Sequence, residues 1–323
     1  MSISALLSAS VWYIGLATLL VGCRRFASFI HLYFLHSSTV QRYLTDDDQA
    51  FALVTGASDG LGKELVVDLY ERGYNIMLHG RNMEKLKAVR DELLASPLPK
   101  RQVEIFYANA VEHESWDFTP LEGKKYTAIF LVAGGSHPTL VPVDEMTDEA
   151  IEWTIRYNAT FHTTLLRYLM PSIRASRVPA FIVGIGSIAQ MHPGAFLTTY
   201  VASKEYLSKF IHGLDQEQRF IDPSLDISFQ FMPIGEFVSK AHVVPITLFC
   251  PSARTIARSV IRSVGYSGHR IVVPYLPHYL GTLLLWAIGR RRSDKFVGEY
   301  IRKRYMSRAQ QARQGKEEPI EDY

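Results

Sequence analysis

Short apolar runs and longer stretches of helical periodicity alternate through the middle of the chain. The short runs predict buried strands, whereas apolar residues spaced three and four apart predict amphipathic helices. Strands are expected at residues 51–55, 75–79, 102–107, 127–132, 179–184 and 226–231, and helices at 63–72, 83–95, 148–170 and 199–220. This alternation predicts an α/β fold: a doubly wound parallel sheet with helices on both faces, whose ligand site lies beyond the carboxyl ends of the strands.

The N-terminus has a different pattern, because the twenty residues 3–22 carry no charged side chain. As a helix this run is about 30 Å long, enough to cross the hydrocarbon core of a bilayer. Arg24 and Arg25 follow at once, so the positive-inside bias puts the rest of the chain on the cytosolic side. Residues 26–35 are expected at the membrane interface. The alternatives are a cleaved signal peptide, a lipoprotein signal ending at Cys23, and a buried helix of a soluble domain.

Apolar residues gather again at 276–289, and three arginines, 290–292, come next. Fourteen residues are fewer than a spanning helix needs, so this segment favours an interfacial helix with its basic end toward anionic headgroups. The alternative is a helix that packs over the substrate cleft. Both arrangements are compatible if the substrate cleft opens at the membrane.

Composition narrows the possible functions. A hydrophobic fraction of 47% in 323 residues is ample for a folded core and excludes a wholly disordered chain. Lys and Arg number 35 and Asp and Glu 32, too balanced for an electrostatic nucleic-acid binder, so no nucleic-acid partner is expected. The two cysteines, Cys23 and Cys250, make neither a disulfide framework nor a zinc ligand set, and no metal site is expected.

A glycine-rich segment, Thr55-Gly-Ala-Ser-Asp-Gly-Leu-Gly62, lies between the first predicted strand and helix. Glycines there allow a tight turn and let the backbone approach a pyrophosphate, while the helix N-terminus offers unpaired N–H groups to the anion. An ordinary glycine turn is the alternative. The position between strand and helix favours a Rossmann-type dinucleotide site.

The end of the second predicted strand reads His79-Gly80-Arg81-Asn82 and lacks the acidic residue that binds the ribose 2′-hydroxyl of NAD. A guanidinium can instead bind a 2′-phosphate, so Arg81 favours NADP(H) as cofactor. The alternative is a solvated arginine that opens the next helix.

A third group of residues could carry acid–base chemistry. Tyr200 and Lys204 are four apart and share one face of a predicted helix, and Ser187 lies at the end of a predicted strand. A phenol has a pKa near 10, so a nearby cation is needed if it is to act near neutral pH. Among 17 tyrosines about one accidental pair at this spacing is expected, so the position of the pair after Ser187 and the glycine turn carries the argument.

In these motifs the sequence resembles the short-chain dehydrogenase/reductase family over residues 51–273. The resemblance implies that Ser187, Tyr200 and Lys204 are catalytic and that Asn158 completes a proton relay with the lysine. It implies cofactor contacts from the glycine turn, the ends of later strands and the catalytic helix, namely Gly56, Ser58, Asp59, Gly60, Leu61, Gly62, Asn109, Ala110, Ala133, Gly134, Tyr200, Lys204, Pro233 and Val238, besides Arg81.

The sequence departs from the family pattern in two places. Leu131-Val132-Ala133-Gly134 stands where the family has Asn-Asn-Ala-Gly, so the hydrogen bonds of both asparagines must be replaced or absent. Residues 232–240 resemble the family's Pro-Gly-x-Val-x-Thr loop in a shifted register.

Within the family, the sequence is most similar to the membrane-bound very-long-chain 3-oxoacyl-CoA reductases and 17-beta-hydroxysteroid dehydrogenases. The resemblance implies an NADPH-dependent ketone reductase at the endoplasmic reticulum, facing the cytosol. A hydrophobic small-molecule substrate, first of all a 3-oxoacyl-CoA, and membrane lipid are the expected partners, and a homo-oligomer is possible. The alternatives are a reductase of steroids or other lipophilic ketones and a non-catalytic NADP-binding scaffold. The expected division is a membrane anchor and linker at 1–45, a catalytic Rossmann-type domain at 46–274 and an amphipathic basic segment at 275–323.

Overall fold

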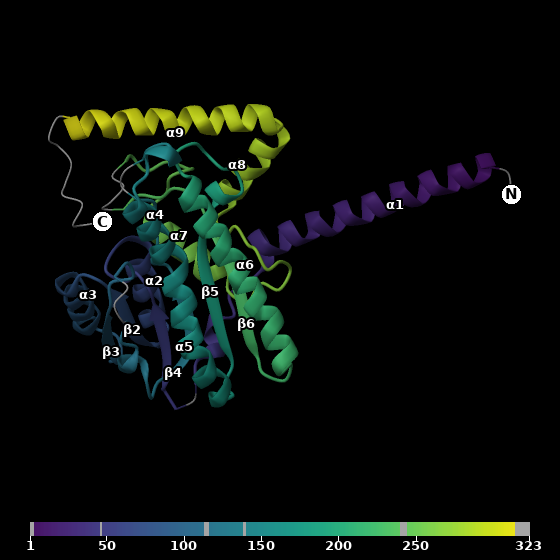
Figure 1. Ribbon diagram of the computed structural model, residues 1–323. Helices are drawn as coiled ribbons and strands as arrows, with labels where there is room; N and C mark the ends of the chain where they lie inside the picture. Colours follow the sequence, from purple (N-terminus) through teal and green to yellow (C-terminus); the bar gives the residue numbers. More distant parts are fainter. Residues whose placement is uncertain (1–2, 46, 113–115, 138–139, 240–243, 314–323) are drawn as a thin grey trace.

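A six-stranded parallel sheet forms the centre of the protein in a computed structural model that describes residues 3–45, 47–112, 116–137, 140–239 and 244–313 (Figure 1). The strand order is β3-β2-β1-β4-β5-β6. The strands are β1 (Ala50–Val54), β2 (Asn75–Gly80), β3 (Val103–Tyr107), β4 (Lys125–Leu131), β5 (Ala180–Ser187) and β6 (Ile227–Ile234). This order confirms the predicted doubly wound fold, in which the chain reverses direction across the sheet between β1 and β4.

Helices cover both faces of the sheet, which is why its inner strands are apolar on both sides. In β1, Ala52 and Val54 pack in one buried cluster, and Phe51 and Leu53 pack in the other. The first cluster contains residues of α2 (Gly60–Glu71), α3 (Met83–Ala95) and α7 (Ala253–Ser263), and the second contains residues of α5 (Phe161–Ser176) and α6 (Thr198–Ile221), which lie in front in Figure 1.

The expected helix at 148–170 differs from the observed one. It begins as α4 (Asp148–Ile155), passes through a π-helical turn at Arg156–Thr160 and continues as α5 beyond the predicted end. The side-chain amide of Asn158, within the π turn, donates a hydrogen bond to the carbonyl oxygen of Thr154 at 2.9 Å. Such single π turns within α-helices are frequent at functional sites. Short 3-10 turns also occur at Thr119–Leu121, Val143–Glu145 and Ile188–Gln190.

The N-terminal helix α1 (Ile3–Ile30) extends away from the body of the protein (Figure 1). It continues through Arg24 and Arg25, eight residues beyond the apolar run at 3–22. The described residues contain one stretch, Ser10–Leu35, that is long and apolar enough to cross a membrane. A π turn (His31–Leu35) and a 3-10 turn (Val40–Tyr43) follow α1.

The segment after α1 packs against the core around the sheet. Val40 and Tyr43 are buried in the same cluster as β1 and α2. The Tyr33 hydroxyl donates to the carbonyl oxygen of Val273 at 2.6 Å, and the Tyr74 hydroxyl donates to that of Val40 at 2.6 Å. These contacts fasten the base of α1 to the domain. The boundary at residue 45 stays a prediction.

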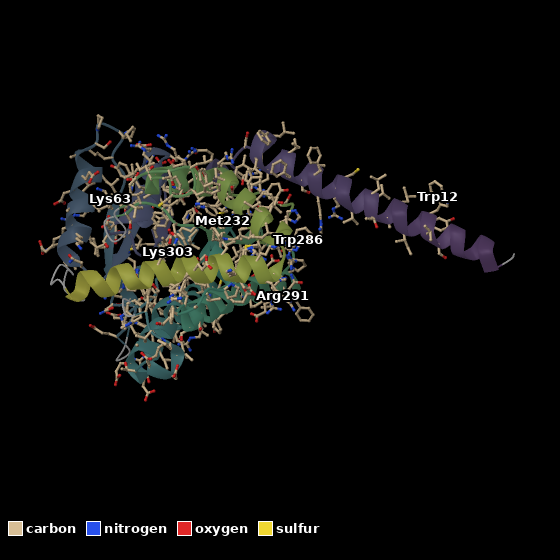
Figure 2. All side chains as sticks on the ribbon, turned by 90° about the horizontal axis from the view of Figure 1, so that it is seen from above. Trp12, Lys63, Met232, Trp286, Arg291 and Lys303 are labelled. Atoms are coloured by element: carbon tan, nitrogen blue, oxygen red, sulfur yellow. The ribbon has the colours of Figure 1, made fainter. Side chains whose placement is uncertain are left out.

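Two helices, α8 (Leu276–Ala287) and α9 (Arg290–Arg313), close the carboxyl edge of the sheet (Figure 1). A Cβ atom placed on Gly194, in the loop after β5, would lie 2.8 Å from Cγ1 of Ile301 and 3.1 Å from Cγ1 of Val297. The Tyr300 hydroxyl bonds to the Glu236 carboxylate just after β6. Helix α9 therefore lies over the loops that follow β5 and β6, and seen from above it crosses the body of the protein (Figure 2). The last residues of the segment expected at 275–323, namely 314–323, lie outside the described part of the chain.

Candidate active site

The glycine turn between β1 and α2 has the conformation that a phosphate cradle needs. Gly56 and Gly60 have φ of 68° and 53°, values that favour glycine. A Cβ atom on Gly62 would overlap the carbonyl oxygen of Gly56, so the helix packs on the turn without room for a side chain. The Asp59 carboxylate caps α2 by accepting from the Gly60 N–H at 2.7 Å. The turn and the N-terminus of a twelve-residue helix therefore fit a bound pyrophosphate.

Neighbouring strand ends support this turn. The backbone N–H of Gly56 donates to Nδ1 of His79, at the end of β2, at 3.3 Å. A Cβ atom on Gly56 would lie 3.1 Å from Cα of Ala133, just after β4. The turn therefore meets the end of β4 at the point where the strand order reverses, which is the ligand-binding position of open α/β sheets.

Lys204, Asn158 and Gly134 meet beside the end of β4. A Cβ atom on Gly134 would lie 2.5 Å from Nζ of Lys204 and 2.6 Å from Oδ1 of Asn158. Asn158 is buried; its amide accepts from the N–H of Gly135 at 3.0 Å and donates to the carbonyl oxygen of the same residue at 2.9 Å. Lys204 donates from Nζ to the carbonyl oxygen of Ile185 in β5 at 3.2 Å. The lysine and the asparagine thus converge from α6 and the π turn, as the resemblance implies.

The Lys204 ammonium group is buried. The residue is only 3% exposed, and burial lowers its pKa to about 8. The group still carries its proton through most of the neutral range. A buried cation one helical turn from Tyr200 favours the phenolate form of that tyrosine.

Ser187 and Tyr200 sit on the two elements that Lys204 connects. Ser187 is the last residue of β5, and its hydroxyl accepts from the N–H of Ala189 at 3.2 Å. Tyr200 is half-buried in the first turn of α6. Gln190 joins the two elements: it accepts from the N–H of Ser187 at 3.2 Å and donates to the Glu205 carboxylate, on α6, at 2.8 Å.

The residues expected on the adenine side follow β2 and β3. Arg81 comes directly after β2 and is half-buried. Burial raises the pKa of the Tyr157 phenol, and the positive charge of Arg81 acts to lower it. Arg81 is therefore close enough to Tyr157, the neighbour of Asn158 in the chain, to act on it electrostatically. Asn109 follows β3 and donates from its amide to the Glu112 carboxylate at 2.8 Å. Four further predicted contacts, Ser58, Leu61, Ala110 and Ala133, lie in the glycine turn, at the start of α2, and just after β3 and β4.

The two residues expected near the nicotinamide lie in and after β6. Pro233 is buried within the strand, in register with Gly186 of β5. Val238 donates from its N–H to the carbonyl oxygen of Pro251 at 2.8 Å, which holds the loop beside the glycine turn. A Cβ atom on Gly60 would lie 3.5 Å from Cβ of Ser239. Residues 240–243 of this loop lie outside the described part.

Three residues that support the site did not stand out in the sequence. Two of them are Gln190 and Glu205, which hydrogen-bond to each other and belong to none of the sequence motifs. The third is His162, fully buried and one helical turn after Asn158. The sequence signal that could have pointed to His162 is a histidine on the otherwise apolar inner face of a predicted helix.

Known proteins share both the sequence pattern and the fold. Residues 50–220 match the family model described as short chain dehydrogenase. A very-long-chain 3-oxoacyl-CoA reductase of Aspergillus terreus is 26% identical over 81% of this chain and 77% of its own length. One from Ajellomyces capsulatus is 27% identical over 83% of this chain and 82% of its own length.

The fold comparison agrees. A solved short-chain dehydrogenase from Sphingobium yanoikuyae, in complex with NADPH, has a TM-score of 0.60 at 21% identity and covers 75% of this chain and 94% of its own. The sheet order, the glycine turn between β1 and α2, and the family model that spans more than half of the sequence lead to the same assignment. The chain belongs to the short-chain dehydrogenase family and is an oxidoreductase of that family.

Proposed function

We propose that this protein is a membrane-anchored, NADPH-dependent reductase that converts the ketone of a long-chain 3-oxoacyl-CoA to the corresponding alcohol. The observation that carries the proposal is the meeting of Lys204, Asn158 and Gly134 beside β5, one helical turn from Tyr200. The substrate class rests on the similarity to fungal proteins named very-long-chain 3-oxoacyl-CoA reductase.

The residues fit a bound NADPH. The glycine turn and the N-terminus of α2 would hold the diphosphate, Arg81 would bind the 2′-phosphate, and Gly134 leaves space beside Lys204 that any side chain would fill. When bound, the cofactor supplies the hydride that forms the new C–H bond at the carbonyl carbon.

In this mechanism Tyr200 is the acid. Its phenolic proton passes to the carbonyl oxygen as the hydride arrives at carbon, so the ketone becomes a secondary alcohol. The charge of Lys204 stabilises the phenolate that remains, and Ser187 donates a hydrogen bond to the carbonyl oxygen. Asn158 holds the turn at Gly134 and Gly135 and so keeps Lys204 in place for reprotonation of the phenolate from solvent.

The membrane attachment rests on three adjoining surfaces. Helix α1 exposes apolar side chains between residues 11 and 26, such as Trp12 (Figure 2). At its base Phe29 stacks on Tyr279 of α8, with ring centroids 5.8 Å apart. Exposed apolar side chains of α8 and the loop before α7 continue from there: Ile246, Leu248, Phe249, Leu280, Leu283, Leu284 and Trp286. Apolar patches of this kind mark membrane or protein contacts.

We therefore propose that α1 spans the membrane while α8 rests on it, with the arginines 290–292 at the headgroups. The arginines after the apolar run favour the cytosolic side for the catalytic domain. The proposed membrane is that of the endoplasmic reticulum, in line with the resemblance to membrane-bound reductases. A lipophilic substrate would then reach the loops under α9 from the bilayer surface.

The test is NADPH oxidation by the purified, detergent-solubilised protein with long-chain 3-oxoacyl-CoAs, steroid ketones and simple ketones. We expect the highest kcat/KM with the acyl-CoAs and loss of turnover in Tyr200→Phe. Tyr206→Phe is the matched control, because this tyrosine lies on the same helix, is exposed and bonds to Thr163. Turnover that survives in Tyr200→Phe refutes the assigned acid, a preference for steroids refutes the substrate class, and NADPH binding without turnover of any ketone indicates a scaffold.

A further inference from the structure

A threonine at the end of β1 supports the backbone just after β4, where the sequence lacks the two asparagines of the family pattern. The N–H groups of Val132 and Ala133 both donate to Oγ1 of Thr55, at 2.8 and 3.0 Å. These two donors occupy both lone pairs of the hydroxyl. Its proton then has two acceptors within reach, Nε2 of His162 at 3.3 Å and the carbonyl oxygen of Phe130 at 3.4 Å. The Phe130 oxygen already accepts from the backbone N–H of Thr55 at 2.9 Å, whereas His162 offers the hydroxyl a side-chain acceptor.

The partners of His162 determine its tautomer. Nδ1 lies 3.3 Å from the carbonyl oxygen of Asn158, which can only accept a hydrogen bond. Nδ1 therefore carries the proton, and Nε2 is free to accept from the Thr55 hydroxyl. Because burial lowers the pKa of His162 to about 3, and the charge of Lys204 acts in the same direction, the ring stays neutral throughout the physiological range.

A continuous chain of hydrogen bonds results. It runs from the N–H groups of Val132 and Ala133 through Thr55 and His162 to the backbone of Asn158. The side chain of Asn158 bonds in turn to both polar groups of the Gly135 backbone. The segment 132–135 is thus held at both ends, and the side chain of His162 connects the two supports.

We propose that His162 is a positioning residue that braces Thr55 against Asn158 and so holds the segment 132–135 in the conformation that receives the cofactor. It does not touch the reacting atoms. A buried histidine that only filled space would be replaceable by leucine, whereas this one is a donor at one nitrogen and an acceptor at the other.

The tautomer can be tested without cofactor or substrate. In protein labelled with ¹⁵N-histidine, we expect the His162 signal, identified by its loss in His162→Gln, to show a neutral ring protonated at Nδ1 from about pH 5 to about pH 8. A ring protonated at Nε2, or one that gains a second proton within this range, contradicts the proposal.

The brace is tested by hydrogen exchange of the same cofactor-free protein. His162→Leu should speed amide exchange in the segment 132–135 by about tenfold, since the Thr55 hydroxyl and the Asn158 carbonyl both lose a partner. Leu165→Ala is the control, because Leu165 lies on the same helix in the second apolar cluster and contributes packing alone. If amide exchange in this segment accelerates equally in both variants, His162 acts by packing alone and the proposal is refuted.

The third readout rests on the proposed function. His162→Leu should raise the dissociation constant of NADPH about tenfold, which corresponds to about 1.4 kcal/mol, and lower kcat while KM for the ketone stays unchanged. An effect on KM for the ketone alone would overturn the proposed role. Should no ketone be turned over, the tautomer and exchange measurements still decide on His162, so the two failures are distinguishable.

Discussion

Replacement of Lys204 by methionine should change how stability depends on pH. Burial lowers the pKa of this lysine from 10.5 to about 8, a difference that corresponds to about 3 kcal/mol. Below about pH 8 the folded protein carries the buried charge at full cost. Between about pH 8 and about pH 10.5 the unfolded chain still binds the proton that the folded protein has released, so stability rises with pH.

The expected result is a free energy of unfolding that rises by about 3 kcal/mol in the wild type, relative to Lys204→Met, between about pH 7 and about pH 10.5. Loss of the bond to the Ile185 carbonyl shifts the variant by a constant amount and leaves this slope unaffected. Urea unfolding of the detergent-solubilised protein, followed by tryptophan fluorescence, measures it. Lys209→Met is the control, because the Lys209 side chain is 72% exposed on the same helix. Parallel curves for the wild type and Lys204→Met would refute the claim that Lys204 is charged and desolvated.

Three further predictions concern the cofactor and the anchor. Gly134→Ala should weaken NADPH binding at least about tenfold, because the new Cβ atom would crowd Lys204 and the φ of this residue is +152°. Gly213→Ala is the control, since Gly213 lies on α6 with open space around it and this variant should bind NADPH like the wild type. Calorimetry measures both dissociation constants, and equal values would contradict the close approach of Gly134 to Lys204. Arg81→Glu should weaken NADPH binding about tenfold or more and spare NADH, and an unchanged ratio of the two constants would remove the 2′-phosphate role. In microsomes, the protein should resist carbonate extraction until Ser10–Leu35 is deleted, and protease added outside should digest the catalytic domain; a protected domain would reverse the proposed orientation.

The elements of the fold were predictable because the strands other than the edge strand β3 are buried on both faces. β1 is an uninterrupted apolar run, β2 and β4 contain the apolar runs 76–78 and 128–131, and the structure confirms the positions of all three strands to within about two residues. The π turn at Asn158 could not be predicted in this way. It depends on a side-chain amide that bonds to the carbonyl of Thr154, and hydrophobic periodicity carries no information about that bond.

The candidate site also has a part that the sequence could predict and a part that it could not. The glycine turn and the Tyr200–Lys204 pair depend on spacing within a few residues and are visible in the sequence. The contacts of Thr55 with His162 and of Gly194 with Ile301 join residues about a hundred positions apart, and nothing local marks either partner. Helix α9 is a further case: the sequence predicted a basic, amphipathic segment there, but nothing in it marked Val297 and Ile301 as the residues that pack on the loop after β5.

The most direct measurement of the central claim is the transfer of label from deuterated NADPH to a long-chain 3-oxoacyl-CoA in a single turnover, followed by mass spectrometry. The account predicts a 3-hydroxyacyl-CoA with deuterium at C3, formed by the wild type and by Tyr206→Phe and absent with Tyr200→Phe. Tight NADPH binding without a labelled product from the acyl-CoA or any other ketone would contradict it.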